Sequence, residues 1–279
     1  MIIKCWGARG SIPVSGKEFL KYGGSTTCLE ITTKGNEIII IDAGSGIRKL
    51  GNKLLKEDRN RLNIVFTHSH WDHLIGFPFF KPLYNDGTTL NLFGCSHTQD
   101  SLQRMISPIM TQPNSPVGFE NIRSNLSFHK NCEETFQIDS VTVTPIFLSH
   151  PGQGLGFKFI EDDKSFVFLT DNELTFIHPG GLSYQDYLAF TRDADLLFHD
   201  AEYTEEEYEY TKAWGHTIYT DALKLALEAG VKKLGLFHHD QDRIDSDLDK
   251  IVRHCEKLID KSGENLECFG VSEEMEIVL

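Results

Sequence analysis

The stretch Thr67-His68-Ser69-His70-Trp71-Asp72-His73 places four candidate metal ligands within six residues, directly after an apolar run, 62–66, that predicts a strand. Because alternate side chains of an extended chain point to the same side, His68 and His70 are expected to bind one cation together. A turn into a helix would direct Asp72 and His73 toward a second cation. Metal sites that hydrolyse phosphate esters commonly hold two ions about 3.5 to 4 Å apart. The stretch therefore predicts a two-metal site at the end of a strand.

Two cations need further ligands, and the remaining candidates also follow predicted strands: His150 after 141–148, Asp171 after 165–170 and His238 after 234–237. Strand ends that meet at one edge of an α/β structure are where binding sites form. A carboxylate such as Asp171 can bridge two cations, whereas an imidazole cannot. The next residue, His239, is an alternative ligand. We prefer His238, because the side chains of residues 234, 236 and 238 point to the same side of a strand.

The chain pattern predicts a mixed α/β class in one domain that covers residues 1–279. Short β-branched or aromatic runs predict strands at 2–6, 28–33, 37–42, 62–67, 90–93, 141–148, 165–170, 196–198 and 234–237. Helical patterns follow Asp72, cover 99–109, follow Thr217 and begin near Ser246. No Pro/Ser-rich linker or internal repeat separates the halves of the sequence. The irregular stretch 108–116 is expected to form a surface loop or lid.

The composition excludes several functional classes. The chain has 27 Lys and Arg against 41 Asp and Glu, which gives a formal net charge of −14. This charge disfavours a nucleic-acid coat protein, which needs a basic stripe, and it disfavours binding to an anionic membrane surface. No apolar run approaches the roughly 18 residues of a membrane span. The N-terminal residues do not form an export leader, so we expect a cytoplasmic protein.

The cysteines are expected to be structural, and most of the histidines that are not ligand candidates are expected at the surface. The six cysteines have no C-x-x-C spacing, and we expect them to be reduced: Cys5, Cys28, Cys95, Cys132, Cys255 and Cys268. Four histidines without a place at a strand end are expected at the surface: His97, His129, His178 and His254. His199 is expected either to donate a hydrogen bond behind the site or to be a core residue.

The motif T-H-x-H-x-D-H, followed by a His, an Asp and a His at strand ends, resembles the metallo-β-lactamase fold superfamily. Residues 41–46, Ile-Asp-Ala-Gly-Ser-Gly, are similar to the first motif of that superfamily, and the resemblance covers nearly the whole chain. It implies a four-layer αβ/βα sandwich with a two-metal site at the shared edge of its halves. It also implies two ligand sets bridged by Asp171 and a hydroxide: His68, His70 and His150 for one metal, and Asp72, His73 and His238 for the other.

Within this superfamily, residues 198–203, 214–217 and 234–238 resemble the phosphodiesterase branch. There, the His that precedes Thr or Ser, here His216, is a catalytic histidine that binds no metal. The resemblance implies hydrolysis of a phosphodiester by metal-bound hydroxide. Asp72 would orient that hydroxide, and His216 would stabilise charge on the phosphate or protonate the leaving oxygen. Asp200, in a position where the branch often has Glu, is expected to orient His216.

The expected substrate is a small or cyclic nucleotide-type phosphodiester, and other functions stay open. An endoribonuclease that processes tRNA 3′ ends uses the same chemistry but needs an electropositive docking surface. The clusters of basic residues at 53–61 and 232–233 are small for such a surface. A glyoxalase-type thioesterase shares the T-H-x-H-x-D-H motif. A non-catalytic, metal-dependent binding module belongs to a third class, but the presence of all seven ligands and His216 favours an enzyme.

The implied cofactors are two divalent metal ions, with Zn²⁺ expected first and Mn²⁺ or Fe²⁺ as alternatives, since the ligands are nitrogen and oxygen donors without a thiolate. Two divalent cations, less the charges of Asp72 and Asp171, would give the pocket a formal charge of +2. A negative surface outside the pocket would discourage a long polyanion. We therefore expect a small phosphodiester as partner, and neither extended nucleic acid nor a membrane. Related phosphodiesterases are commonly dimers, so the resemblance also implies a homodimer.

Overall fold

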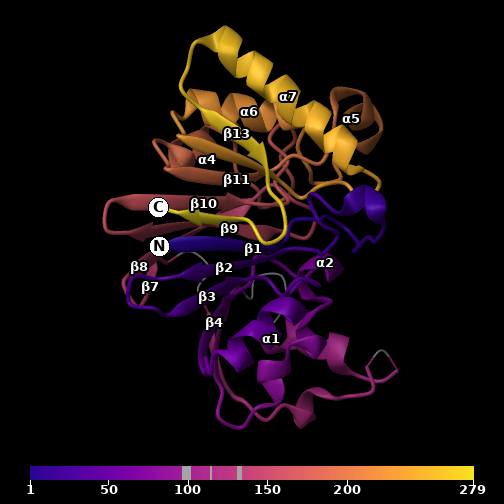
Figure 1. The fold of residues 1–279 in the computed structure, drawn as a ribbon, viewed down its shortest axis with the longest axis vertical. Helices are drawn as coiled ribbons and strands as arrows, with labels where there is room; N and C mark the ends of the chain where they lie inside the picture. Colours follow the sequence, from indigo (N-terminus) through magenta and orange to yellow (C-terminus); the bar gives the residue numbers. More distant parts are fainter. Residues whose placement is uncertain (96–101, 114, 131–133) are drawn as a thin grey trace.

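The computed structural model describes residues 1–95, 102–113, 115–130 and 134–279, and it consists of two mixed sheets packed face to face (Figure 1). The first sheet has the strand order β14 (Glu276–Val278), β1 (Ile2–Gly7), β2 (Cys28–Thr32), β3 (Ile38–Ile41), β4 (Arg61–Val65), β5 (Thr89–Gly94) and β6 (Asn125–Lys130). Strands β3 to β6 are parallel to one another, whereas β2, β1 and β14 are joined in antiparallel pairs.

The second sheet has the strand order β13 (Glu267–Gly270), β12 (Lys233–Phe237), β11 (Leu196–Asp200), β10 (Lys164–Leu169), β9 (Gly154–Glu161), β8 (Val141–Leu148) and β7 (Phe136–Ile138). Strands β10 to β13 are parallel, and β10, β9, β8 and β7 form antiparallel pairs. Each sheet thus contains a parallel half, and parallel strands bring their carboxyl ends to one edge of the sheet.

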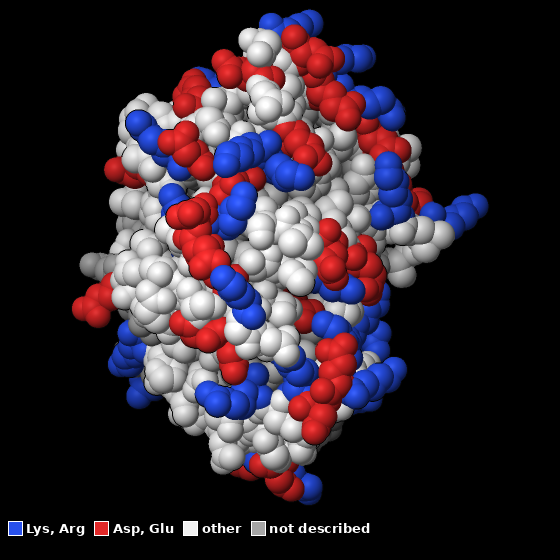
Figure 2. Space-filling view, turned by 60° about the vertical axis from the view of Figure 1, so that its left-hand side comes forward, with Lys and Arg blue, Asp and Glu red and all other residues white. Residues whose placement is uncertain are grey.

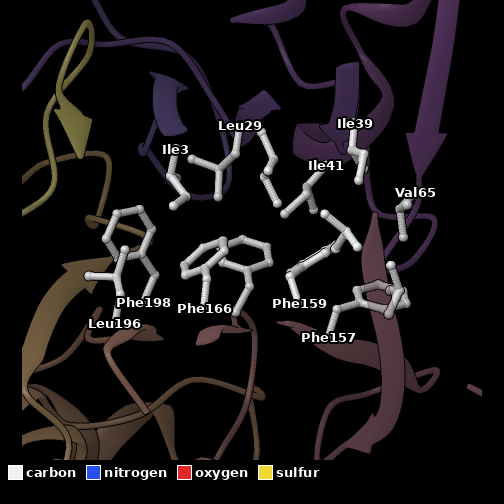
Figure 3. Packing of buried hydrophobic residues seen from close by; sticks show 14 of the residues in the cluster. Ile3, Leu29, Ile39, Ile41, Val65, Phe157, Phe159, Phe166, Leu196 and Phe198 are labelled. Carbon is white, nitrogen blue, oxygen red and sulfur yellow. The ribbon is translucent and has the colours of Figure 1, made fainter. Parts of the chain in front are cut away.

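A core of alternating side chains fills the space between the two sheets (Figure 3). Isoleucine, leucine and valine side chains of the first sheet face a row dominated by phenylalanine from the second: Ile3, Leu29, Ile39, Ile41 and Val65 against Phe157, Phe159, Phe166, Leu196 and Phe198. This burial is the main force that holds the sheets together. The two ends of the chain also meet, because β1 pairs with β14 and Leu279 N donates to Met1 O.

Helices cover the outer faces of both sheets. α1 (Ile47–Lys56), α2 (Trp71–Leu74) and α3 (Leu102–Ile106) contribute to the core outside the first sheet, together with η2 (Phe77–Phe79), η3 (Lys81–Tyr84) and η4 (Ser107–Met110). α4 (Tyr184–Thr191), α6 (Tyr219–Glu228) and α7 (Asp245–Ser262) cover the second sheet. The remaining short helices are η1 (Lys17–Phe19), η5 (Phe119–Asn121) and α5 (Glu205–Thr211). The expected four-layer αβ/βα sandwich is confirmed.

All nine predicted strands fall on strands of the structure, and the predicted helices after Asp72, after Thr217 and near Ser246 are present as α2, α6 and α7. The helical pattern 99–109 corresponds to α3 and η4 as far as it is described, and the expected loop 108–116 begins inside η4. No helix in the described ranges is long and apolar enough to cross a membrane. One cysteine expectation is wrong, since Cys95 is disulfide-bonded. Cys132 and His97 lie outside the described residues.

Candidate two-metal site

The structure brings the seven ligand candidates together at the carboxyl ends of four strands. The segment after β4 and the start of α2 supply four of them, and the others follow β8, β10 and β12: His68, His70, Asp72 and His73, then His150, Asp171 and His238. Their donor atoms form two groups that share Asp171, and within each group the atoms lie within 4.8 Å of one another. The prediction that these strand ends converge is therefore met by the fold.

The first group consists of His68, His70, His150 and Asp171. His150 Nε2 lies 2.9 Å from His70 Nδ1, and Asp171 Oδ2 lies 3.6 Å from His68 Nε2 and 3.8 Å from His150 Nε2. Burial lowers the pKa of His150 to about 3 and that of His68 well below its usual range. These imidazoles are therefore neutral at pH 7, which is the form that binds metals.

The second group consists of Asp72, His73, Asp171 and His238. His73 Nε2 lies 3.2 Å from an oxygen of each aspartate, and His238 Nε2 lies 3.1 Å from Asp72 Oδ2 and 3.3 Å from Asp171 Oδ2. Burial alone would lower the pKa of both histidines, but the aspartates outweigh it and raise both pKa values well above the usual range. The carboxylates of this group therefore stabilise positive charge at the two histidines.

Hydrogen bonds on the far side of each ring fix the direction of the lone pairs. His150 Nδ1 donates to Gly215 O at 3.0 Å, His73 Nδ1 lies 2.8 Å from Asp42 Oδ2, and His238 Nδ1 lies 2.7 Å from Glu202 Oε2. Because a carbonyl or carboxylate accepts the Nδ1 proton, Nε2 is the nitrogen of each ring that faces the site and that binds a metal once it carries no proton. Nε2 of His68 and of His73 also have no hydrogen-bond partner although they are buried. Converging lone pairs and carboxylates fit two divalent cations.

The backbone at the strand ends is strained in the same region. Asp42 and His238 are the first residues after β3 and β12, and Asp171 is the second residue after β10. Their φ angles are 60°, 58° and 51°, respectively. Positive φ is uncommon for residues other than glycine, and such strain concentrates at functional sites. The conformation is one reason to regard these three positions as parts of one site.

A network of imidazoles and carboxylates lies beside the second group: Asp200, Glu202, His216 and His238. His216 Nδ1 lies 2.7 Å from Asp200 Oδ2 and 3.1 Å from Glu202 Oε2. Burial lowers the pKa of His216, but Glu202 and Asp200 outweigh it and raise this pKa to about 9. His216 is therefore protonated at pH 7, and the expected contact with Asp200 is present despite the shorter side chain.

Two glycines permit close approach of the loops around the site. A Cβ at Gly10 would lie 2.4 Å from the His238 ring, and a Cβ at Gly215 would lie 2.1 Å from His150 Nδ1. Gly215 also has φ +97°. Gly10 thus lets the loop after β1 pack against one candidate ligand, His238, and Gly215 lets the loop before His216 pack against another, His150.

The other histidines separate clearly from the two groups. His239 Nε2 donates to Val271 O at 2.8 Å and is turned away from the aspartates, so the structure favours His238 over His239. His199 is buried between Asp200 O and the Asn172 side chain. His129 and His254 are exposed as expected. The expectation for His178 is wrong, because this residue is buried and its Nε2 lies 2.8 Å from Glu173 Oε2.

Three carboxylates around the site were not given a role from the sequence. Asp42 accepts from Thr67 N and Thr67 Oγ1 as well as from His73. Glu202 contacts His216 and His238. Glu173 is buried and holds the loop before His216, since it accepts from Ala213 N and Gly215 N at 2.8 Å each. Asp42 was detectable from its place after a strand, whereas Glu173 and Glu202 have no local signal.

A family model described as beta-lactamase superfamily domain matches residues 37–239, a span that contains all seven ligand candidates and His216. The chain belongs to the beta-lactamase superfamily. Its fold and the clustered His and Asp side chains place it among metal-binding hydrolases of the metallo-β-lactamase fold.

Two curated relatives are named ribonuclease Z. The relative from Oceanobacillus iheyensis is 21% identical over 279 aligned positions, which cover 84% of this chain and 89% of the relative. The relative from Picrophilus torridus is 22% identical and covers 98% of this chain and 96% of its own length. The similarity therefore extends over nearly the whole length of these relatives.

Three solved structures share the fold. The metallo-β-lactamase fold protein YhfI from Bacillus subtilis has a TM-score of 0.72 at 15% identity, with 99% of this chain and 98% of that chain covered. A diphosphatase of the PhnP family has a TM-score of 0.70 at 16% identity, with 100% and 97% covered. The short form of human tRNase Z has a TM-score of 0.66 at 18% identity, with 100% and 99% covered. These likenesses establish the architecture over the entire chain.

Proposed function

We propose that this chain is a phosphodiesterase that uses two divalent cations. The observation that supports this most is the pair of donor groups that share Asp171, with the Nδ1 protons of His73, His150 and His238 directed outward. Two cations in such a site would lower the pKa of a bound water and stabilise the phosphate oxygens during in-line displacement. We place one cation with His68, His70, His150 and Asp171, and the other with Asp72, His73, Asp171 and His238.

His216 is the residue that we propose to interact with the leaving group of the substrate. Its Nδ1 is engaged by Asp200 and Glu202, so Nε2 is the nitrogen that is able to face a substrate. With a pKa of about 9, the ring carries a proton at Nε2 at pH 7. It can then stabilise charge on the phosphate or donate that proton to the departing oxygen.

Asp72 has an orienting role in addition to its role as a ligand. Its Oδ2 accepts from Ser11 N at 3.1 Å and faces His238 Nε2 at the same distance. We therefore propose that the other oxygen of Asp72, Oδ1, accepts a hydrogen bond from the attacking water and so orients it. Zn²⁺ is the metal that we propose first, with Mn²⁺ or Fe²⁺ as alternatives, because imidazoles and carboxylates accept all three.

For the substrate, the names of the curated relatives support tRNA 3′-end processing better than the small phosphodiester that we expected from the sequence. We therefore propose precursor tRNA as the first substrate to test. A small or cyclic phosphodiester is the second candidate, since the net charge of −14 opposes a long polyanion. On the face in Figure 2, Lys and Arg side chains alternate with Asp and Glu and form no continuous basic stripe.

The test is a substrate panel on protein that is first freed of metal and then supplied with Zn²⁺, Mn²⁺ or Fe²⁺. The panel contains precursor tRNA, cyclic nucleotides, bis(p-nitrophenyl) phosphate and a glyoxalase-type thioester. Metal-dependent cleavage of any phosphodiester supports the proposal, and the ratio of kcat/KM values for tRNA and cyclic nucleotides assigns the substrate size. Cleavage of the thioester with no cleavage of a phosphodiester would contradict it.

A further inference from the structure

An apolar groove of about 390 Å³ lies along the outer side of the segment that starts with α2. Its walls include Trp71, Ile75, Pro78 and Phe79 from one segment of the chain and Ile109 and Val117 from another. No residue that lines it within the described part of the chain carries a charge. Its volume lies in the range of small-molecule sites, roughly 300 to 1,000 Å³.

One wall residue of the groove, Trp71, is adjacent in sequence to two of the ligand candidates. Trp71 lies between His70 and Asp72, one residue from each of the two donor groups. His70 is exposed whereas Asp72 is buried, so the site opens to solvent on the side of His70. Trp71 is 71% exposed, and its side chain forms part of the groove wall. A molecule whose phosphate lies at the site and that leaves it on the side of the exposed His70 would meet Trp71 next.

The surface that the groove offers is apolar and includes exposed aromatic side chains. Phe79 is 63% exposed, and such exposed aromatic side chains usually mark binding surfaces. The two hydroxyl groups in the walls are already engaged: Tyr84 Oη donates to Pro78 O at 2.7 Å, and Ser115 Oγ donates to Val117 O at 2.8 Å. A charged or strongly hydrated group would lose its water there without finding a partner. The groove therefore selects an uncharged, preferably aromatic, moiety.

We propose that this groove binds the base of the nucleotide whose phosphate occupies the metal site, with the base stacked on Trp71 and Phe79. This inference rests on the proposed phosphodiesterase function. A nucleobase is uncharged and presents a π-face whatever its identity, so it stacks on aromatic side chains without sequence preference. The assignment holds for precursor tRNA and for a small nucleotide alike, because both carry a base next to the phosphate.

The experiment compares adenosine 5′-monophosphate with ribose 5-phosphate, which carries the same phosphate without a base. Calorimetric titration of the metal-loaded protein should give a Kd for adenosine 5′-monophosphate that is roughly 5- to 160-fold lower than the Kd for ribose 5-phosphate, the range of one stacked base. In the variants Trp71→Ala and Phe79→Ala this ratio should fall toward one. The matched control is Tyr210→Ala, since Tyr210 is 82% exposed but is not among the groove residues, and it should retain the wild-type ratio.

Several outcomes would overturn the assignment. These are equal affinities of the wild type for both ligands, failure to bind either, or an equal loss for both ligands in Trp71→Ala and Phe79→Ala. If the wild type forms a dimer that Trp71→Ala dissociates while the ratio stays near one, the groove binds a second copy of the chain and not a base. Hydrolysis of bis(p-nitrophenyl) phosphate is measured in parallel. Hydrolysis with equal affinities contradicts only the groove assignment, whereas absence of hydrolysis contradicts the proposed function.

Discussion

His216 and His238 share one carboxylate oxygen, because Glu202 Oε2 lies 3.1 Å from His216 Nδ1 and 2.7 Å from His238 Nδ1. The two rings also stack, with centroids 4.7 Å apart and an angle of 15° between their planes. Glu202 is buried, so these contacts are shielded from water. One side chain thus orients both a proposed ligand and the proposed proton donor.

Replacing Glu202 by Gln should weaken both functions at once. The amide keeps the size of the side chain but loses the negative charge that faces the two rings. Loss of a carboxylate behind a metal-binding histidine typically costs about 10- to 100-fold in metal affinity or activity. We expect a decrease of this size in kcat/KM together with weaker retention of one metal, measured by elemental analysis after dialysis. Wild-type activity and metal content in Glu202→Gln would show that the contact of Glu202 with His216 and His238 contributes to neither catalysis nor metal binding.

Replacing His216 by Ala should separate catalysis from metal binding. His216 belongs to neither of the two donor groups that share Asp171, so the variant should keep two metal ions. Loss of a positioned proton donor typically costs about 10²- to 10⁴-fold in rate. Measured turnover of a cyclic nucleotide, whose alkoxide leaving group requires a proton, should fall by this factor at unchanged metal content. Turnover equal to that of the wild type would remove His216 from the mechanism.

The grouping of the seven ligand candidates was predictable from the sequence because each candidate follows an apolar strand within two residues or lies within one short motif. His150, Asp171 and His238 are separated by tens of residues, but each occupies the first position or two after a strand, and parallel strands end at a common edge. Strands with weaker patterns were not predicted. β6 is largely exposed, and β14 is a three-residue edge strand.

Helices without a clear apolar stripe were also missed. α5 contains no buried residue, so no periodic pattern marks it. In α1, the buried positions Ile47, Leu50, Gly51 and Leu54 have helical spacing, but glycine interrupts the apolar stripe. The structure explains the glycine, since a Cβ at Gly51 would lie 2.8 Å from the Phe80 ring. Packing between distant segments selected a residue that weakens the local signal.

The charge of the site was the main quantity that local sequence could not provide. The expected charge of +2 counted only Asp72 and Asp171. The fold adds three buried carboxylates beside the histidines: Asp42, Asp200 and Glu202. Counted together with the protonated His216, these carboxylates lower the formal charge of the site from +2 to zero, so a substrate phosphate would depend on direct contact with the cations more than on attraction from a distance.

Replacing Glu173 by Gln should disorder the loop that carries Gly215 and His216. The Glu173 carboxylate accepts from Tyr208 Oη and Ala213 N at Oε1 and from His178 Nε2 and Gly215 N at Oε2. An amide group would place an N–H against two of these donors. A buried donor left without a partner costs about 1 to 3 kcal/mol.

We expect Glu173→Gln to lower the free energy of unfolding by about this amount, measured by urea denaturation, and to lower kcat more than it raises KM. Tyr208→Phe is the matched control, because it removes one of the four donors and leaves the carboxylate in place. It should have a smaller effect on both quantities. Equal effects of the two variants would show that Glu173 does not hold the loop.

Removal of metal should destabilise the folded chain, because the site gathers buried histidines and carboxylates in a geometry that a cation can bind only in the folded state. His73 Nε2 and His238 Nε2 both face Asp72 and Asp171 at 3.1 to 3.3 Å. A metal at 100 times its Kd stabilises a protein by about 2.7 kcal/mol per site, which corresponds to roughly 5 to 10 °C in Tm for a chain of this size. Calorimetry with and without chelator should show this difference. In Asp171→Asn, which changes both donor groups, the difference should largely disappear, whereas His254→Ala, at an exposed histidine, should retain it. A wild-type Tm that is insensitive to both chelator and added metal would contradict the proposed site.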